Sequence, residues 1–222
     1  MVKAIYFLKR KPGMDLDEFF TYWRTKHADA VRKVPELRRY VQCHTIRSGY
    51  SKGEPVWDGA AELWYDDTAT MRRIAATPES RAAAADDDAF LDMSRFEFIL
   101  TDEVVQKESA VTPSMVHLVE FVNRKSGMDV AAFHRYWREH HGPLAIGLPM
   151  MRRYVQSHVR ESAYSDGREP RYDGVAEVWF DSTDAMRESA KGELYAKVRE
   201  DEPNFIDTAR LSFIITRDHQ IV

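Results

Sequence analysis

The sequence predicts an α+β protein built from two copies of one strand-helix-strand-strand-helix-strand unit. Two observations support this prediction. Residues 13–27 return at residues 127–141, a spacing of 114, with Gly, Met, Asp, Phe, Tyr, Trp, Arg and His in the same order. The chain has 222 residues, so each copy has the length of a typical single domain. A long repeat that occurs only as a pair indicates a duplication rather than a solenoid.

Each element of the unit has its own local pattern. In the first helix, Asp15 with Glu18 three residues later is a capping-box pattern. The apolar residues from Leu16 to Trp23 then form one helical stripe, and runs of β-branched, aromatic or alternating residues predict the strands. In the first half we expect strands at 2–9, 38–46, 59–65 and 95–101, a helix from Asp15 that ends before Pro35, a helix after Asp66, and a short helical turn within 82–92 beyond Pro78.

The second half repeats this order, and together the halves follow the ferredoxin-like βαββαβ pattern. Its predicted elements are a strand at 115–123, a helix at 130–144, strands at 152–160 and 174–180, a helix after Asp181 and a strand at 210–216. The polar segment 104–114 is predicted to be a surface linker between repeats at 1–103 and 115–222. A sheet with helices on one face needs cover on the other. We therefore expect two sheets packed face to face, with the ligand pocket between them.

Composition excludes several classes of function. A net charge of −4 and a pI near 6.1 argue against a nucleic-acid partner. Neither a membrane span nor a signal peptide is visible. One cysteine allows no internal disulfide and fits a reducing cytoplasm. Phosphate-binding and dinucleotide motifs and metal-ligand spacings are absent, so we expect neither a metal nor a cofactor. A thiol nucleophile is not expected, because Cys43 is replaced by Ser157 in the second copy.

Polar residues repeat along the second strand of each half, which reads R-R-Y-V-Q-C-H at 38–44 and R-R-Y-V-Q-S-H at 152–158. Successive side chains of a strand point to opposite faces. We expect Val41 and Cys43 to pack on the helices, so the other face would point into the pocket. The residues of that face would be binding and catalytic groups, or they would form a hydrogen-bonded ladder in the core. They are Arg38, Tyr40, Gln42 and His44, with Arg152, Tyr154, Gln156 and His158 in the second half.

Each third strand carries a Glu and a Trp two residues apart, so that the two share a face. A buried carboxylate is costly without a partner, and a histidine on the neighbouring strand would supply one. Such a pair would be a base with its orienting group or a structural ion pair. The register that we predict sets His44 opposite Glu62, Gln42 opposite Trp64 and His158 opposite Glu177, whose face also carries Trp179.

Two histidines end the repeated helix motif. His27 and His141 each follow a Trp by four residues, which places them on the buried side of the helix. A buried histidine is either a packed core residue or an acid/base group that titrates near neutral pH. The run Asp86–Asp88 is predicted to be a solvated acidic turn.

The motifs F-L-K-R-K-P-G-M-D, F-x-x-Y-W-R-x-x-H, L-R-R-Y-V-Q-x-H and D-G-A-A-E-L-W-Y resemble an EthD domain, and the second half resembles it independently. The resemblance implies a dimeric α/β barrel, here formed by two halves of one chain. Related barrels include cofactor-free monooxygenases, lactone isomerases, polyketide cyclases and dehydratases, and haem enzymes. The motif histidine carries over to His27 and His141. Gly142–Pro143 keeps the usual continuation, which Ala28–Asp29 lacks, so we favour the second half as the site.

These observations lead to a functional hypothesis. The protein is expected to be a cytoplasmic, cofactor-independent enzyme that performs proton transfer or simple oxidation on a small apolar or aromatic metabolite. The alternatives are a non-catalytic small-molecule binding or accessory protein and a haem-binding barrel. Association into a homodimer is compatible with the sequence. The predicted catalytic residues are His141, His158, Glu177, Tyr154, His27, His44, Glu62 and Tyr40, and the predicted substrate-binding residues are Gln42, Trp64, Gln156, Trp179, Arg38 and Arg152.

Overall fold

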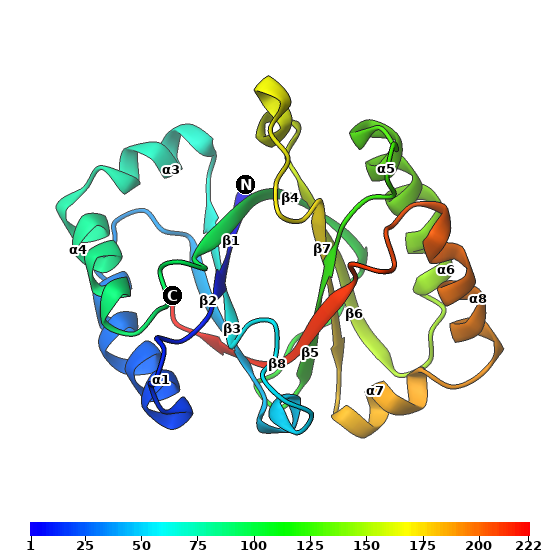
Figure 1. Ribbon diagram of the computed structural model, residues 1–222, viewed down its shortest axis with the longest axis horizontal. Coiled ribbons are helices and arrows are strands. Elements are labelled where there is room, and N and C mark those ends of the chain that lie inside the picture. The colour runs from blue at the N-terminus through cyan, green and yellow to red at the C-terminus, as the bar shows by residue number, and fades with distance from the viewer. The chain divides into compact units, whose positions relative to one another are not determined.

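The computed structural model describes residues 1–222 and divides into two compact units (Figure 1). The first unit contains Met1–Leu100 and Asp218–Val222, and the second contains Thr101–Arg217. Each unit has its own antiparallel sheet, and its helices cover one face of that sheet (Figure 1). The duplication of an α+β unit is therefore confirmed. None of the helices combines the length and the apolar character that a membrane-spanning helix requires.

In the first unit, β3 lies between β1 and β2 and is antiparallel to both. Asp15 caps the first helix by accepting hydrogen bonds from the backbone N–H groups of Asp17 and Glu18, as the capping pattern predicts. Pro78 begins a helix instead of interrupting one, because the first helical turn tolerates a missing N–H. The elements are β1 (Val2–Leu8), α1 (Leu16–Tyr22), the π-helix η1 (Trp23–His27), α2 (Ala28–Val31), β2 (Arg39–Thr45), η2 (Arg47–Tyr50), β3 (Gly59–Tyr65), α3 (Thr68–Ala75), α4 (Pro78–Asp86), η3 (Asp87–Ala89) and β4 (Glu97–Lys107).

The second unit repeats this order, and β7 lies between β5 and β6. Its first helix again begins at a capping aspartate, Asp129, and again passes into a π-helix at the tryptophan of the repeated motif. The elements are β5 (Val116–Val122), α5 (Val130–Tyr136), the π-helix η4 (Trp137–His141), α6 (Gly142–Ala145), β6 (Met151–Val159), η5 (Glu161–Gly167), β7 (Gly174–Phe180), α7 (Thr183–Ser189), α8 (Glu193–Asp201), η6 (Glu202–Asn204) and β8 (Ser212–Gln220).

Two strands are longer than the sequence predicts. Strand β4 does not end at Thr101 but continues to Lys107, and Thr101–Lys107 pair with β6. Residues 104–107 are therefore strand rather than linker, because β6 offers them backbone hydrogen-bond partners. Strand β8 pairs with β5 and extends to Gln220. The hydrogen-bonded strand order is β1-β3-β2 in the first unit and β8-β5-β7-β6-β4 in the second, so each half is an antiparallel α+β unit, in agreement with the predicted fold class.

A buried tryptophan organises the core of each unit. Trp23 and Trp137 are 0% and 1% exposed and belong to the apolar clusters between sheet and helices. Each ring lies so close to the start of the third strand that a Cβ on Gly59 or Gly174 would stand 2.6 Å from a ring carbon. The glycine repeated at this point is therefore a packing requirement, since any larger residue would displace the tryptophan.

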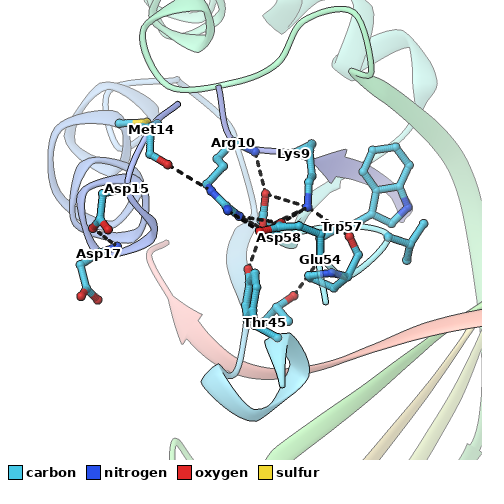
Figure 2. A network of polar contacts seen from close by, with 12 residues as sticks. Lys9, Arg10, Met14, Asp15, Asp17, Thr45, Glu54, Trp57 and Asp58 are labelled. Atoms are coloured by element: carbon cyan, nitrogen blue, oxygen red, sulfur yellow. Dashed lines mark hydrogen bonds and ion pairs between the residues drawn. The ribbon is translucent and has the colours of Figure 1, made fainter. Parts of the chain in front are cut away.

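The aspartate before that glycine ties the loops of each unit together. In the first unit, the Asp58 carboxylate accepts hydrogen bonds from the Arg10 backbone N–H at 2.9 Å and from Arg10 Nη1 at 2.6 Å (Figure 2). It also accepts a hydrogen bond from the Tyr50 hydroxyl at 2.6 Å. Asp173 accepts the same set of bonds in the second unit, from Arg124 and Tyr164. These contacts hold the turn before the first helix against the loop before the third strand.

Candidate functional site

The two faces of the second strand are reversed from those predicted. Val41 lies opposite Glu62, whereas Gln42 lies opposite Ala61 and His44 opposite Gly59. In the second unit, His158 likewise lies opposite Gly174, not opposite Glu177. The predicted histidine–glutamate pairs are therefore wrong. The hairpin register puts the members of each pair on opposite faces of the sheet.

Tyr40, Gln42 and His44 lie on the face that the helices cover. The indole Nε1 of Trp23 donates to the Tyr40 hydroxyl at 2.9 Å, and the His44 ring stacks on the Trp23 ring at a centroid distance of 4.4 Å. Trp23 is a helix residue, so the predicted packing of Val41 and Cys43 against the helices is wrong. A buried indole N–H needs an acceptor, and a tyrosine hydroxyl satisfies this need where valine cannot.

Gln156 and Gln42 each connect three groups of this face. Gln156 Nε2 donates to the Trp137 carbonyl at 2.9 Å and to the Tyr154 hydroxyl at 3.1 Å, and Gln156 Oε1 lies 3.0 Å from His158 Nε2. Since Oε1 can only accept, His158 carries its proton on Nε2. Burial lowers the pKa of His158 to about 3, with His134 and Arg138 acting in the same direction. His158 is therefore a neutral core residue, and Gln42 makes the same bonds beside His44.

The predicted acidic residues lie on the opposite face of the sheet. Lys3 Nζ is 3.2 Å from Glu62 Oε1, and Ser157 Oγ donates to Glu177 Oε2 at 2.5 Å. Near them, Arg39 and Arg153 sit over the rings of Trp64 and Trp179. The remaining predicted binding residues, Arg38 and Arg152, form exposed pairs with Asp66 and Asp181. None of these residues lines the cavities described next, because the cavities lie on the helix side.

The second unit contains a cavity of about 430 Å³ on the helix-covered face of its sheet. Most of its wall is apolar and includes Leu118, Val178 and Phe205. The sequence-predicted residues His141 and Tyr154 both line it, so the structure brings these two together. Four charged residues of the wall, Glu120, Arg187, Arg199 and Glu202, were not predicted from the sequence.

His141 is held at the cavity wall by Asp201. Its Nδ1 lies 2.8 Å from Asp201 Oδ2, while the Tyr136 hydroxyl and Asn204 Nδ2 donate to Asp201 Oδ1 at 2.5 and 3.2 Å. Burial raises the pKa of Asp201, but these bonds outweigh burial and hold it below its ordinary value. An ionised carboxylate only accepts, so the imidazole proton is on Nδ1 and the lone pair is on Nε2. Burial lowers the pKa of His141, against the pull of Asp201, and keeps the ring neutral.

Tyr154 presents a donor to the same cavity. Its hydroxyl oxygen accepts from Trp137 Nε1 at 3.0 Å and from Gln156 Nε2 at 3.1 Å. With both lone pairs engaged, the hydroxyl has only its own proton left to offer. Burial raises the pKa of Tyr154, so the hydroxyl stays protonated. A ligand oxygen in the cavity can therefore accept a hydrogen bond from Tyr154.

The first unit contains the corresponding cavity in a smaller form, about 180 Å³, which His27 and Tyr40 line. His27 Nδ1 lies 3.1 Å from Asp86 Oδ2, and the Tyr22 hydroxyl donates to Asp86 Oδ1 at 2.6 Å. Asp87 also lines this cavity, and burial together with the charges of Asp86 and Asp88 raises its pKa to about 7.

The prediction of a solvated turn at Asp86–Asp88 is thus wrong for its first two residues. Asp86 ends helix α4 and Asp87 begins η3, and both face the side where His27 and the cavity lie. The repeat contains a signal that could have identified them. Asp86 and Asp201 recur at a spacing of 115 residues, each four residues before a phenylalanine.

The fold and these cavities define a duplicated ferredoxin-like protein with a helix-covered cavity in each half. The chain belongs to the EthD family, since the EthD domain matches residues 11–94 and again residues 125–209. No curated protein matches the chain.

Solved structures resemble the chain in fold. An anthrone oxidase-like protein has a TM-score of 0.64 at 10% identity, over 99% of this chain and 92% of its own. A candidate monooxygenase from Lactobacillus acidophilus NCFM has a TM-score of 0.56 at 11% identity, over 100% of this chain and 94% of its own. An ethyl tert-butyl ether D (EthD) family protein from Bacillus halodurans C-125 has 26% identity and a TM-score of 0.40, over 47% of this chain and 99% of its own.

Proposed function

We propose that the cavity of the second unit is the active site of a cofactor-independent enzyme that removes a proton from a small, largely apolar carbonyl compound. The observation that carries this proposal is the pair formed by His141 and Asp201 at the wall of an apolar cavity. A neutral imidazole oriented by a carboxylate is a typical general base. Burial depresses the pKa of His141, so it remains a free base at neutral pH.

Each group has a definite task in this reaction. His141 Nε2 takes a proton from the carbon next to the carbonyl, and Asp201 stabilises the imidazolium that forms. The electron pair of the broken C–H bond moves toward the carbonyl group. The substrate thereby becomes an enolate with negative charge on its oxygen. Tyr154 donates a hydrogen bond to that oxygen, because its own lone pairs are occupied. Return of the proton to another carbon gives an isomerase, and loss of a leaving group gives a lyase.

The relatives agree with a small-molecule function without specifying it. One structure of similar fold is named for a monooxygenase and another for an anthrone oxidase-like protein. Proton removal is a step that oxidation of an activated C–H compound shares with isomerisation and elimination. The proposed reaction is therefore proton removal from a substrate that has a carbonyl group, an acidic C–H bond and an apolar body.

Deuterium exchange tests the proposal without the natural substrate. The probe is 2-tetralone in D₂O, an aromatic ketone with acidic C–H bonds, and exchange is followed by proton NMR. The wild-type chain should accelerate exchange, and His141→Ala should lower the enzyme-dependent rate by about 10²–10⁴-fold. His140→Ala removes the exposed neighbouring imidazole, whose side chain is 65% exposed, and should retain most of the rate.

Exchange no faster with wild type than with His141→Ala would show that His141 is not a base. If 2-tetralone then still binds, the alternative of a non-catalytic binding protein takes the place of the enzyme. The haem alternative predicts a Soret absorption band in the purified protein, whereas the proposal predicts a colourless protein that is active after treatment with a chelator.

A further inference from the structure

Glu202 is a buried carboxylate at the cavity wall with one oxygen unsatisfied. The residue is only 5% exposed and begins helix η6, directly after the Asp201 that holds His141. Its Oε1 accepts from Arg199 Nη1 at 2.8 Å. Its Oε2 is enclosed and has no hydrogen-bond partner. Leaving a buried polar atom without a partner is unfavourable, and a ligand in the cavity that Glu202 lines is the natural source of a donor.

The charges around the cavity favour a ligand without negative charge. Besides Glu202, a second carboxyl group, Glu120 of β5, lines the wall. The two arginines of the wall already have carboxylate partners, since Arg199 binds Glu202 and Arg187 binds Asp184. A carboxylate or phosphate ligand would therefore meet two acidic side chains and would have to displace an existing ion pair.

We infer that the second-unit cavity selects a neutral hydroxylated compound, whose hydroxyl group donates to Glu202 while its carbonyl group accepts from Tyr154. This inference rests on the proposed function, which places the substrate carbonyl at Tyr154, and it adds the class of substrate. Glu202 is then a specificity-determining residue, because it selects the hydroxyl group. The apolar wall between the two polar ends holds the body of the ligand, so the substrate is a hydroxylated ring or chain that carries a carbonyl group.

Binding of three naphthalene derivatives, measured by calorimetry at pH 8, tests the inference. Burial raises the pKa of Glu202 to about 7, so most of its carboxyl group is ionised at this pH. 2-Naphthol carries the hydroxyl donor, 2-methoxynaphthalene has the same body without the donor, and 2-naphthoate carries a negative charge. Wild type should bind 2-naphthol about tenfold or more tightly than the methyl ether, and 2-naphthoate more weakly than either. Glu202→Met should bring the naphthol-to-ether preference close to one.

Glu200→Met is the matched control, because Glu200 is an exposed residue of helix α8 only two positions before Glu202, and its substitution also removes a carboxylate. It should keep the wild-type preference. If Glu202→Met does not fold by circular dichroism, Glu202→Gln replaces it. That variant should lower the preference several-fold, since an amide oxygen is a weaker acceptor than a carboxylate.

The inference is overturned if wild type binds 2-naphthol no more tightly than the ether, if none of the probes binds, or if Glu202 variants keep the wild-type preference. These outcomes are separate from the exchange assay on 2-tetralone, which has no hydroxyl group. Exchange that depends on His141 without a hydroxyl preference would leave the proposed function standing and remove only the substrate class.

Discussion

The two units of this chain share a hydrogen-bonded framework and differ in the cavity beside it. The indole-to-tyrosine bond is 2.9 Å from Trp23 to Tyr40 and 3.0 Å from Trp137 to Tyr154. The glutamine two residues after each tyrosine makes matching bonds, and each motif histidine has an aspartate partner. This framework is buried, so each of its donors and acceptors needs its partner.

The cavities differ because other residues of their walls are not part of this hydrogen-bonded framework and can change between the copies. The position of Glu120 is taken by Tyr6, whose ring stacks on Phe98 at a centroid distance of 5.1 Å, and the position of Glu202 is taken by the shorter Asp87. The volume is about 180 Å³ in the first unit against about 430 Å³ in the second. Residues that repeat in both copies therefore belong to the shared scaffold. Residues that differ between the copies determine the size and polarity of each cavity, and so we expect them to decide which copy binds a ligand.

The largest expected difference between the units is in catalysis. His141→Ala should lower 2-tetralone exchange by about 10²–10⁴-fold, whereas His27→Ala should leave the rate within about twofold, because the smaller cavity has less room for the ketone. Parallel NMR exchange assays on both variants measure this ratio. Equal losses would mean that both units are active, and a loss confined to His27→Ala would reverse the assignment.

The tyrosines should separate catalysis from stability. Tyr154→Phe removes the donor to the enolate oxygen and should lower the exchange rate by about 10²-fold. Tyr40→Phe should leave the rate nearly unchanged. Both substitutions leave a buried indole N–H without its acceptor, so each should lower the free energy of unfolding by about 1–3 kcal/mol. Denaturant titration and the exchange assay together check this, and unequal stability losses would refute the shared framework.

The glycines should respond alike in the two units. Gly59→Ala and Gly174→Ala each place a Cβ 2.6 Å from a tryptophan ring carbon. Each should lower the free energy of unfolding by about 1–3 kcal/mol through overpacking. Thermal and denaturant unfolding measure this loss. Gly53→Ala, at a loop position with no atom within 4 Å of the added Cβ but a φ of +116°, separates steric contact from backbone strain.

The smallest expected effect is in the pH dependence of stability. Burial and the charge of Glu120 raise the pKa of Glu202 to about 7, whereas an unfolded glutamate titrates near about 4.3. Between these values the folded state holds a proton that the unfolded state has released, so this group makes the free energy of unfolding fall as pH rises. Glu202→Gln should therefore lose about 1 kcal/mol less stability than wild type between pH 5 and pH 8.

Asp87→Asn should show a change of the same sign, because the pKa of Asp87 is also raised to about 7. Urea titrations at several pH values measure both variants. Identical pH profiles for wild type and Glu202→Gln would show that this carboxyl group is not protonated in the folded state.

Local sequence patterns determined much of this protein. The duplication, the order of strands and helices, the cap at Asp15 and the burial of His27 and His141 all follow from residues close together in the chain. Each depends on a spacing of three or four residues in a helix or two in a strand, or on direct repetition. The tertiary structure is not needed to read such features.

The tertiary structure alone decided which face of each strand meets the helices. Alternation separates Tyr40 from Val41 but does not say which one points to the helix layer. A buried indole that needs an acceptor settled this, and that contact joins residues 17 positions apart. The partner of His141 lies 60 positions away at Asp201, a distance over which no local spacing can predict a contact.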